Sequence, residues 1–143
     1  MSGPYTVDAS VFLNAFNPYK AGYQDSNRLL TRFQQEGVPI VVPTLLLPEV
    51  AGNIARGRQD ANLARAFVSS LSNLPHLIFV SLDAAAAHRA AEMAAGHRLR
   101  GNDAVYASVA LQFGGTLVTL DQEQKERVAR ILPARLPSEI RTP

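Results

Sequence analysis

Four short runs of apolar, β-prone residues divide the chain: PYTV at 4–7, VPIVVP at 38–43, LIFVSL at 77–82 and TLVTL at 116–120. Turn-forming or polar residues bound each run. Such runs are typical of strands buried in the interior of a sheet. Each run is apolar at successive positions, so we expect these strands to be covered on both faces.

Stretches with helical spacing of apolar residues lie between the runs, including 26–37, which ends on Gly37, and 61–71. Strands that alternate with helices indicate parallel strands joined by helical crossovers. The pattern therefore predicts an α/β fold, a three-layer α/β/α sandwich with a central, mainly parallel sheet. The proline-rich tail leaves room for one further edge strand at 134–136.

Composition narrows the kinds of site that the chain can form. The 143 residues fit a single domain over 1–143, with 47% hydrophobic and 18% charged residues and a net charge of +2. There is no cysteine, so any metal must be held by oxygen or histidine ligands. We see neither a bilayer-length apolar run nor a secretion signal, and we expect a cytoplasmic protein without membrane contact.

Acidic residues recur where the predicted strands end. Asp8, Asp83 and Asp121 follow the first, third and fourth runs, and Glu49 follows the second at a short distance, on the first turns of a helix. Asp103 opens the apolar helix that leads into the fourth run. In an open parallel sheet, ligands bind beyond the carboxyl ends of the strands, where the strand order reverses.

Helix capping is the competing explanation for a strand-end aspartate. Asp83 precedes an alanine-rich helix, and we assign it as a cap. Asn102 can cap the next helix, which moves Asp103 into the first turn, on one face with Ala107 and Ala110. Clustered carboxylates repel one another, and Mg²⁺ or Mn²⁺ is the natural compensating cation for an all-oxygen site.

The segments YTVDASVFLNAF, PTLLLPEVAGNIAR, RLRGNDAVYASVALQFGG and TLVTLD together resemble the PIN domain family, in particular toxins of the VapC type. The resemblance runs from Tyr5 to Asp121. It implies a metal-binding catalytic set of Asp8, Glu49, Asp103 and Asp121, with Ser10 and Thr119 as hydroxyl residues that position the acids or a water. The family often has a second acid two residues after the last one, followed by an aromatic residue. Here Glu123 occupies the position of that second acid, and the aromatic residue is missing.

The resemblance implies an endoribonuclease that uses Mg²⁺ or Mn²⁺ to hydrolyse RNA phosphodiester bonds, as the toxin of a toxin–antitoxin pair. Partners would be RNA, a small antitoxin and a second copy of the chain in a homodimer. Arg98, Arg100 and Arg56 are candidate RNA contacts, since each lies near a candidate acid in sequence. Two alternatives stay open: a PIN-fold module that binds RNA or protein without cutting, and an RNA-processing nuclease that is not a toxin.

Overall fold

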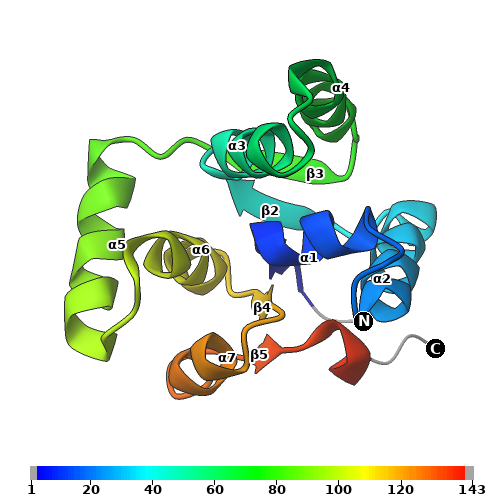
Figure 1. The fold of residues 1–143 in the computed structure, drawn as a ribbon. Coiled ribbons are helices and arrows are strands. Elements are labelled where there is room, and N and C mark those ends of the chain that lie inside the picture. The colour runs from blue at the N-terminus through cyan, green and yellow to red at the C-terminus, as the bar shows by residue number, and fades with distance from the viewer. Residues whose placement is uncertain (1–2, 141–143) are drawn as a thin grey trace.

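The computed structural model describes residues 3–140, which form a five-stranded sheet surrounded by helices (Figure 1). In chain order the elements are β1 (Tyr5–Val7), α1 (Ala9–Ala15), α2 (Tyr23–Glu36), β2 (Ile40–Pro43), α3 (Leu46–Arg58), α4 (Ala61–Ser72), β3 (Leu77–Val80), α5 (Ala84–His97), α6 (Gly101–Gln112), β4 (Thr116–Val118), α7 (Gln122–Val128), β5 (Ala134–Arg135) and a 3₁₀ turn, Pro137–Glu139. No helix within residues 3–140 combines the length and apolarity needed to span a membrane.

The sheet has the strand order β3-β2-β1-β4-β5, and every neighbouring pair is parallel. The four predicted strands and the predicted edge strand near 134–136 are all present. The α/β fold with a central parallel sheet is therefore confirmed. The chain builds outward from β1 to β3 on one side and from β4 to β5 on the other, so the strand order reverses between β1 and β4.

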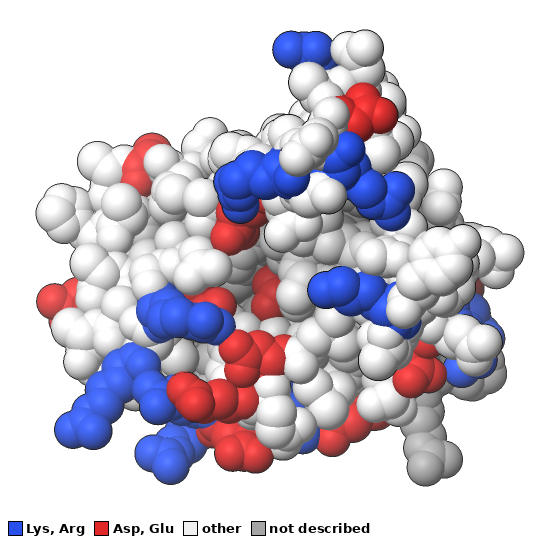
Figure 2. Space-filling view, in the orientation of Figure 1, with Lys and Arg blue, Asp and Glu red and all other residues white. Residues whose placement is uncertain are grey.

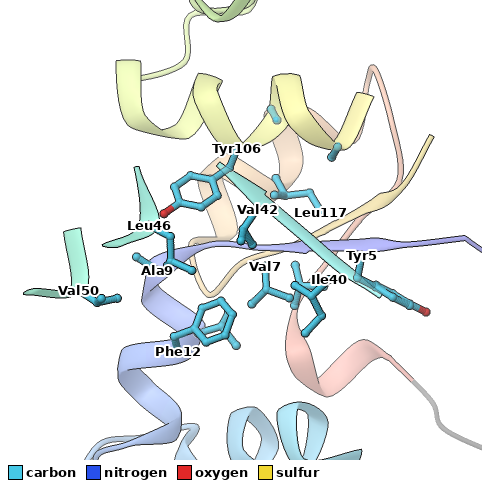
Figure 3. Close-up of a cluster of buried hydrophobic side chains, with 14 of the residues drawn as sticks. Tyr5, Val7, Ala9, Phe12, Ile40, Val42, Leu46, Val50, Tyr106 and Leu117 are labelled. Carbon is cyan, nitrogen blue, oxygen red and sulfur yellow. The ribbon is translucent and has the colours of Figure 1, made fainter. Parts of the chain in front are cut away.

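Helices cover both faces of the central strands. Helix α6 packs against β1, β2 and β4, with α5 outside it, while α1 and α2 lie on the opposite face (Figures 1 and 3). Fully buried side chains fill the space between the layers, among them Val7, Ile40, Val42 and Leu117. Burying an aliphatic side chain of this size contributes about 1.5–3 kcal/mol, so these strands and helices form one core.

Both helices predicted by residue range are present, with small differences at their ends. The helix predicted at 26–37 is α2, which begins three residues earlier and stops at Gly37, whose φ of 65° takes the left-handed conformation that glycine adopts freely. The helix predicted at 61–71 is α4, and Asp60 caps it by accepting a hydrogen bond from the Leu63 N–H.

The expectation of strands covered on both faces is wrong for β3. Leu77 is buried there, but Ile78 is 48% exposed. The physical reason is position: β3 ends the sheet, whereas the helices pack over the central strands. An apolar run in the sequence does not distinguish a central strand from an edge strand.

Candidate active site

The four acids singled out in the sequence come from four separate elements at the carboxyl edge of the sheet. Asp8 directly follows β1 and Asp121 lies just beyond β4, the two strands between which the order reverses. Glu49 lies in the first turn of α3, as predicted, and Asp103 in the first turn of α6. Figure 2 shows acidic side chains gathered in a central hollow of this face, with basic side chains around it.

Asp8 is buried at the start of α1, with only 6% of its surface exposed. Its carboxylate caps the helix by accepting from the Ser10 N–H at 3.0 Å, and the Ser10 hydroxyl also donates to it. Burial raises the pKa of Asp8 to about 6, against the lowering effect of hydrogen bonds from Ser10 and Thr119, and the charge of Asp103 adds to the rise. Asp8 therefore lies in a site that disfavours its negative charge.

Asp103 and Asp121 share one cationic partner, Arg100. The Arg100 Nε donates to Asp103 Oδ2 at 2.9 Å, and its terminal Nη2 donates to Asp121 Oδ2 at 2.7 Å. Burial raises the pKa of Asp103, Arg100 opposes this rise, and the charge of Asp121 adds to it. The charge of Asp103 acts on Asp8 and the charge of Asp121 acts on Asp103, so the three aspartates form one electrostatic cluster.

Glu49 reaches the same region from α3 and is held by two side chains of α6. Its Oε1 accepts from the Tyr106 hydroxyl at 2.5 Å, and its Oε2 accepts from the Asn102 side-chain amide at 3.2 Å. Tyr106 is 1% exposed, and its pKa is raised by burial, by the hydrogen bond to Glu49 and by the charges of Glu49 and Asp8. In Figure 3 its ring reaches from α6 toward Ala9 and Leu46.

The prediction that Asn102 caps α6 is wrong. The N-cap is Arg100, in an extended conformation, and it makes no side-chain capping bond. Asn102 is the second residue of the helix, and its amide is directed across the site to Glu49. A contact between residues 53 positions apart leaves no local sequence signal, so capping statistics alone favoured the wrong role.

Asp83 is a helix cap, as predicted, since its carboxylate accepts from the Ala86 N–H at 2.9 Å. Helix capping and membership of the acidic cluster, which the sequence interpretation treated as alternatives, can occur at the same aspartate. Asp8 and Asp121 each cap the helix that follows them, the latter through the Gln124 N–H, and both still lie in the acidic cluster. A cap occupies one carboxylate oxygen and leaves the other oxygen for a second partner.

Ser10 and Thr119 lie beside the acids, where the resemblance places hydroxyl residues. The Ser10 hydroxyl accepts from the Leu120 N–H at 3.4 Å, which links the start of α1 to the segment after β4. Thr119 is fully buried, accepts from the Asp121 N–H at 3.1 Å and donates to the Gln124 side chain at 2.7 Å. These bonds fix the positions of Asp8 and Asp121 relative to each other.

The basic candidates take different positions. Arg56 lies in the last turn of α3, and Arg98 ends α5 with a φ of 57°. Within residues 3–140, neither side chain forms an ion pair with an acid of the cluster. Arg127 pairs with Glu123, whose side chain is 77% exposed, so this carboxylate is engaged away from the four acids.

A groove of about 600 Å³ adjoins the acidic cluster at Ser10. It runs between α1 on one side and α3 and α4 on the other. Asn53 and Ile54 form part of one wall, and Lys20 and Arg58 place positive charge along it. The groove is therefore of mixed polarity and reaches Ser10, which donates hydrogen bonds to Asp8.

The donor set suits a hard divalent cation, because all four candidate ligands are carboxylates and the buried Asp8 forms no ion pair within residues 3–140. In their present arrangement, however, no three His, Asp or Glu side chains of the described chain are grouped so as to hold a metal ion. Instead, the Arg100 guanidinium lies between Asp103 and Asp121.

Solved structures with the same fold include several toxin–antitoxin proteins. VapBC2 from Rickettsia felis, solved with a promoter DNA fragment, has a TM-score of 0.68 at 17% identity, covering 92% of this chain and 97% of that one. VapC20 from Mycobacterium tuberculosis, described as a toxin that cleaves the sarcin–ricin loop, has a TM-score of 0.71 at 15% identity, covering 85% and 93%. A toxin–antitoxin complex from Klebsiella pneumoniae has a TM-score of 0.66 at 17% identity, covering 95% and 99%.

The family is identified from the sequence, because these structures are distant relatives that show only the fold. No curated protein matches it significantly. The family model described as "PIN domain" matches residues 5–130, which include β1 to α7 and all four acids of the cluster. Because this match covers most of the chain, the chain belongs to the PIN domain family.

Proposed function

We propose that this protein is an endoribonuclease that uses Mg²⁺ or Mn²⁺ to hydrolyse RNA phosphodiester bonds. The observation that carries the proposal is the convergence of Asp8, Glu49, Asp103 and Asp121 from four elements at the point where the strand order reverses. A cluster of carboxylates with a buried member at such a point is suited to binding a divalent cation. Family membership adds support, because the full set of acids is present.

Asp8, Asp103 and Asp121 would hold the cation, with Glu49 binding directly or through a water. The bound ion would lower the pKa of a water molecule and stabilise charge on the scissile phosphate. The chain itself positions these groups: Ser10 and Thr119 orient Asp8, while Tyr106 and Asn102 orient Glu49. No side-chain nucleophile is needed.

RNA must approach an acidic centre, which requires positive charge around it. Lys20 and Arg58 line the groove that leads to Ser10, and Arg56 and Arg98 stand on the elements that carry Glu49 and precede Asp103. The RNA backbone would follow this groove to the acids. The matched PIN segment accounts for residues 5–130, and we propose that 1–143 acts as one domain.

The role of toxin, with a small antitoxin partner and a homodimeric state, is part of the same proposal. It is supported by the likeness to VapBC2, to VapC20 and to the Klebsiella pneumoniae complex. Phe16, which is 56% exposed and lines the groove, offers an apolar contact for a protein partner. The alternative hypothesis to be tested is a PIN-fold module that binds RNA or protein without nuclease activity.

Metal removal tests the enzymatic proposal directly. The purified protein is incubated with end-labelled RNA in Mg²⁺, in Mn²⁺ and in EDTA, and Mn²⁺ binding is measured by calorimetry. We expect cleavage in either metal, 5′-phosphate and 3′-hydroxyl products, and no cleavage in EDTA. Equal cleavage in EDTA would contradict a metal mechanism, and the absence of both cleavage and Mn²⁺ binding would favour the binding module.

Tyr106→Phe tests the positioning of Glu49. The change removes the hydroxyl that donates to Glu49 Oε1 but keeps the buried ring, so the fold should persist. Partners that orient a metal-binding carboxylate typically contribute about 10- to 100-fold to activity or metal affinity. We expect a loss of that size in cleavage rate, measured against Tyr23→Phe as a control. An unchanged rate and Mn²⁺ affinity would show that Glu49 needs no such positioning.

A further inference from the structure

Within residues 3–140, Arg100 forms the only ion pairs with acids of the cluster. It lies in the short connection between α5 and α6, and its guanidinium donates through two nitrogens to two different carboxylates, Asp103 and Asp121. These aspartates belong to α6 and to the start of α7. A planar guanidinium is suited to bridging carboxylates in this way, because its donors point in fixed directions.

The bonds of Asp121 leave little room for a metal ion while Arg100 stays in place. Asp121 Oδ1 accepts from the Gln124 N–H, and Asp121 Oδ2 accepts from Arg100. Asp103 likewise presents its Oδ2 to Arg100. A Mg²⁺ ion needs oxygen ligands at roughly 2.0–2.1 Å, so it would compete with the guanidinium for the same two oxygens.

The contacts of Arg100 are also weak enough to exchange. Its side chain is 69% exposed, and ion pairs this open to water contribute little stability. The capping bond of Asp121 does not depend on Arg100, so α7 keeps its N-terminus when the guanidinium leaves. Displacement therefore requires a change of side-chain conformation and no rearrangement of the backbone.

We propose that Arg100 is an internal competing cation: it neutralises Asp103 and Asp121 in the metal-free protein and must be displaced before these residues bind a divalent metal. The inference rests on the proposed metal-dependent function and adds to it a residue that sets metal affinity. The role of Arg100 as an RNA contact stays a prediction from sequence, and this proposal adds a role at the metal site.

Arg100→Gln tests the proposal through metal affinity measured in the absence of RNA. The change removes the competing charge and keeps a polar, though shorter, side chain. Removing one like charge from beside a bound cation is expected to tighten Mn²⁺ binding about tenfold, measured by calorimetry. Arg98→Gln is the matched control, because it removes the same charge two residues away, where no ion pair with the acids is recorded, and should change affinity less than about twofold.

Arg100→Lys supplies a second variant in case the glutamine variant is poorly folded. Lysine keeps the charge but lacks the fork that bridges two carboxylates, so Mn²⁺ affinity should fall between wild type and Arg100→Gln. Circular dichroism confirms the fold of each variant. Unchanged or weaker Mn²⁺ binding by Arg100→Gln, with wild type binding Mn²⁺, overturns the competing-cation proposal and leaves the nuclease proposal standing. Failure of both wild type and Arg100→Gln to bind Mn²⁺ overturns the proposed function itself.

Discussion

Asp103→Asn is expected to reduce metal-dependent RNA cleavage by at least about 10²- to 10³-fold while the protein stays folded. Asparagine has nearly the same shape as aspartate, so the packing of α6 through its buried residues Ala104 and Ala107 is preserved. The variant loses the negative charge that the proposed cation requires and the charge that Arg100 contacts. Cleavage of labelled RNA in Mg²⁺ measures the effect, with circular dichroism as the check on folding.

Asp83→Asn is the matched control for this prediction. Asp83 is also an aspartate that follows a strand and caps a helix, but it lies after the edge strand β3. Within residues 3–140 it forms no hydrogen bond or ion pair with an acid of the cluster. Asparagine caps helices about as well as aspartate, so the variant should keep its stability and cut RNA within about twofold of wild type. Undiminished cleavage by Asp103→Asn, or an equal loss in both variants, would contradict the assignment of Asp103.

The strands and the positions of the acids follow from local sequence, which is why both could be predicted. Asp8 and Asp121 come just after apolar runs, and parallel strands bring their carboxyl ends to one edge of the sheet. Glu49 is placed by its short distance from β2. The exposure of Ile78 could not be predicted, because it depends on which strand lies at the end of the sheet.

The partners of the acids were the part of the site that sequence reasoning missed. Arg100 reaches Asp121 across 21 positions, and Tyr106 reaches Glu49 across 57, so neither pair leaves a short-range pattern. One signal was available: Asn102 and Tyr106 are four residues apart in a helix, hence on one face. Two polar side chains on one face of this helix indicated a shared polar partner, which the structure identifies as Glu49.

Asp8→Asn is expected to stabilise the metal-free protein at neutral pH, contrary to the usual effect of changing a buried residue. The folded-state pKa of Asp8 is about 6, above the value of 3.8 expected in the unfolded chain, because burial disfavours the carboxylate. The folded protein therefore binds this proton more tightly than the unfolded chain does. The associated stability is present below pH 4 and is lost as the pH rises through 6, which amounts to about 3 kcal/mol at pH 7.

Urea unfolding in EDTA at pH values from 4 to 7 measures this effect. Because asparagine does not titrate, the free energy of unfolding of wild type minus that of Asp8→Asn reports the titration of Asp8. This difference should fall across this range and level off above pH 6, where Asp8 is ionised in both the folded and the unfolded state. Mn²⁺ at pH 7 should then stabilise wild type and leave the variant unchanged, because a ligand stabilises only the state that binds it. A difference that is flat with pH would contradict the raised pKa. The expected pattern would mean that the burial of Asp8 lowers the stability of the metal-free fold and that a bound cation restores it.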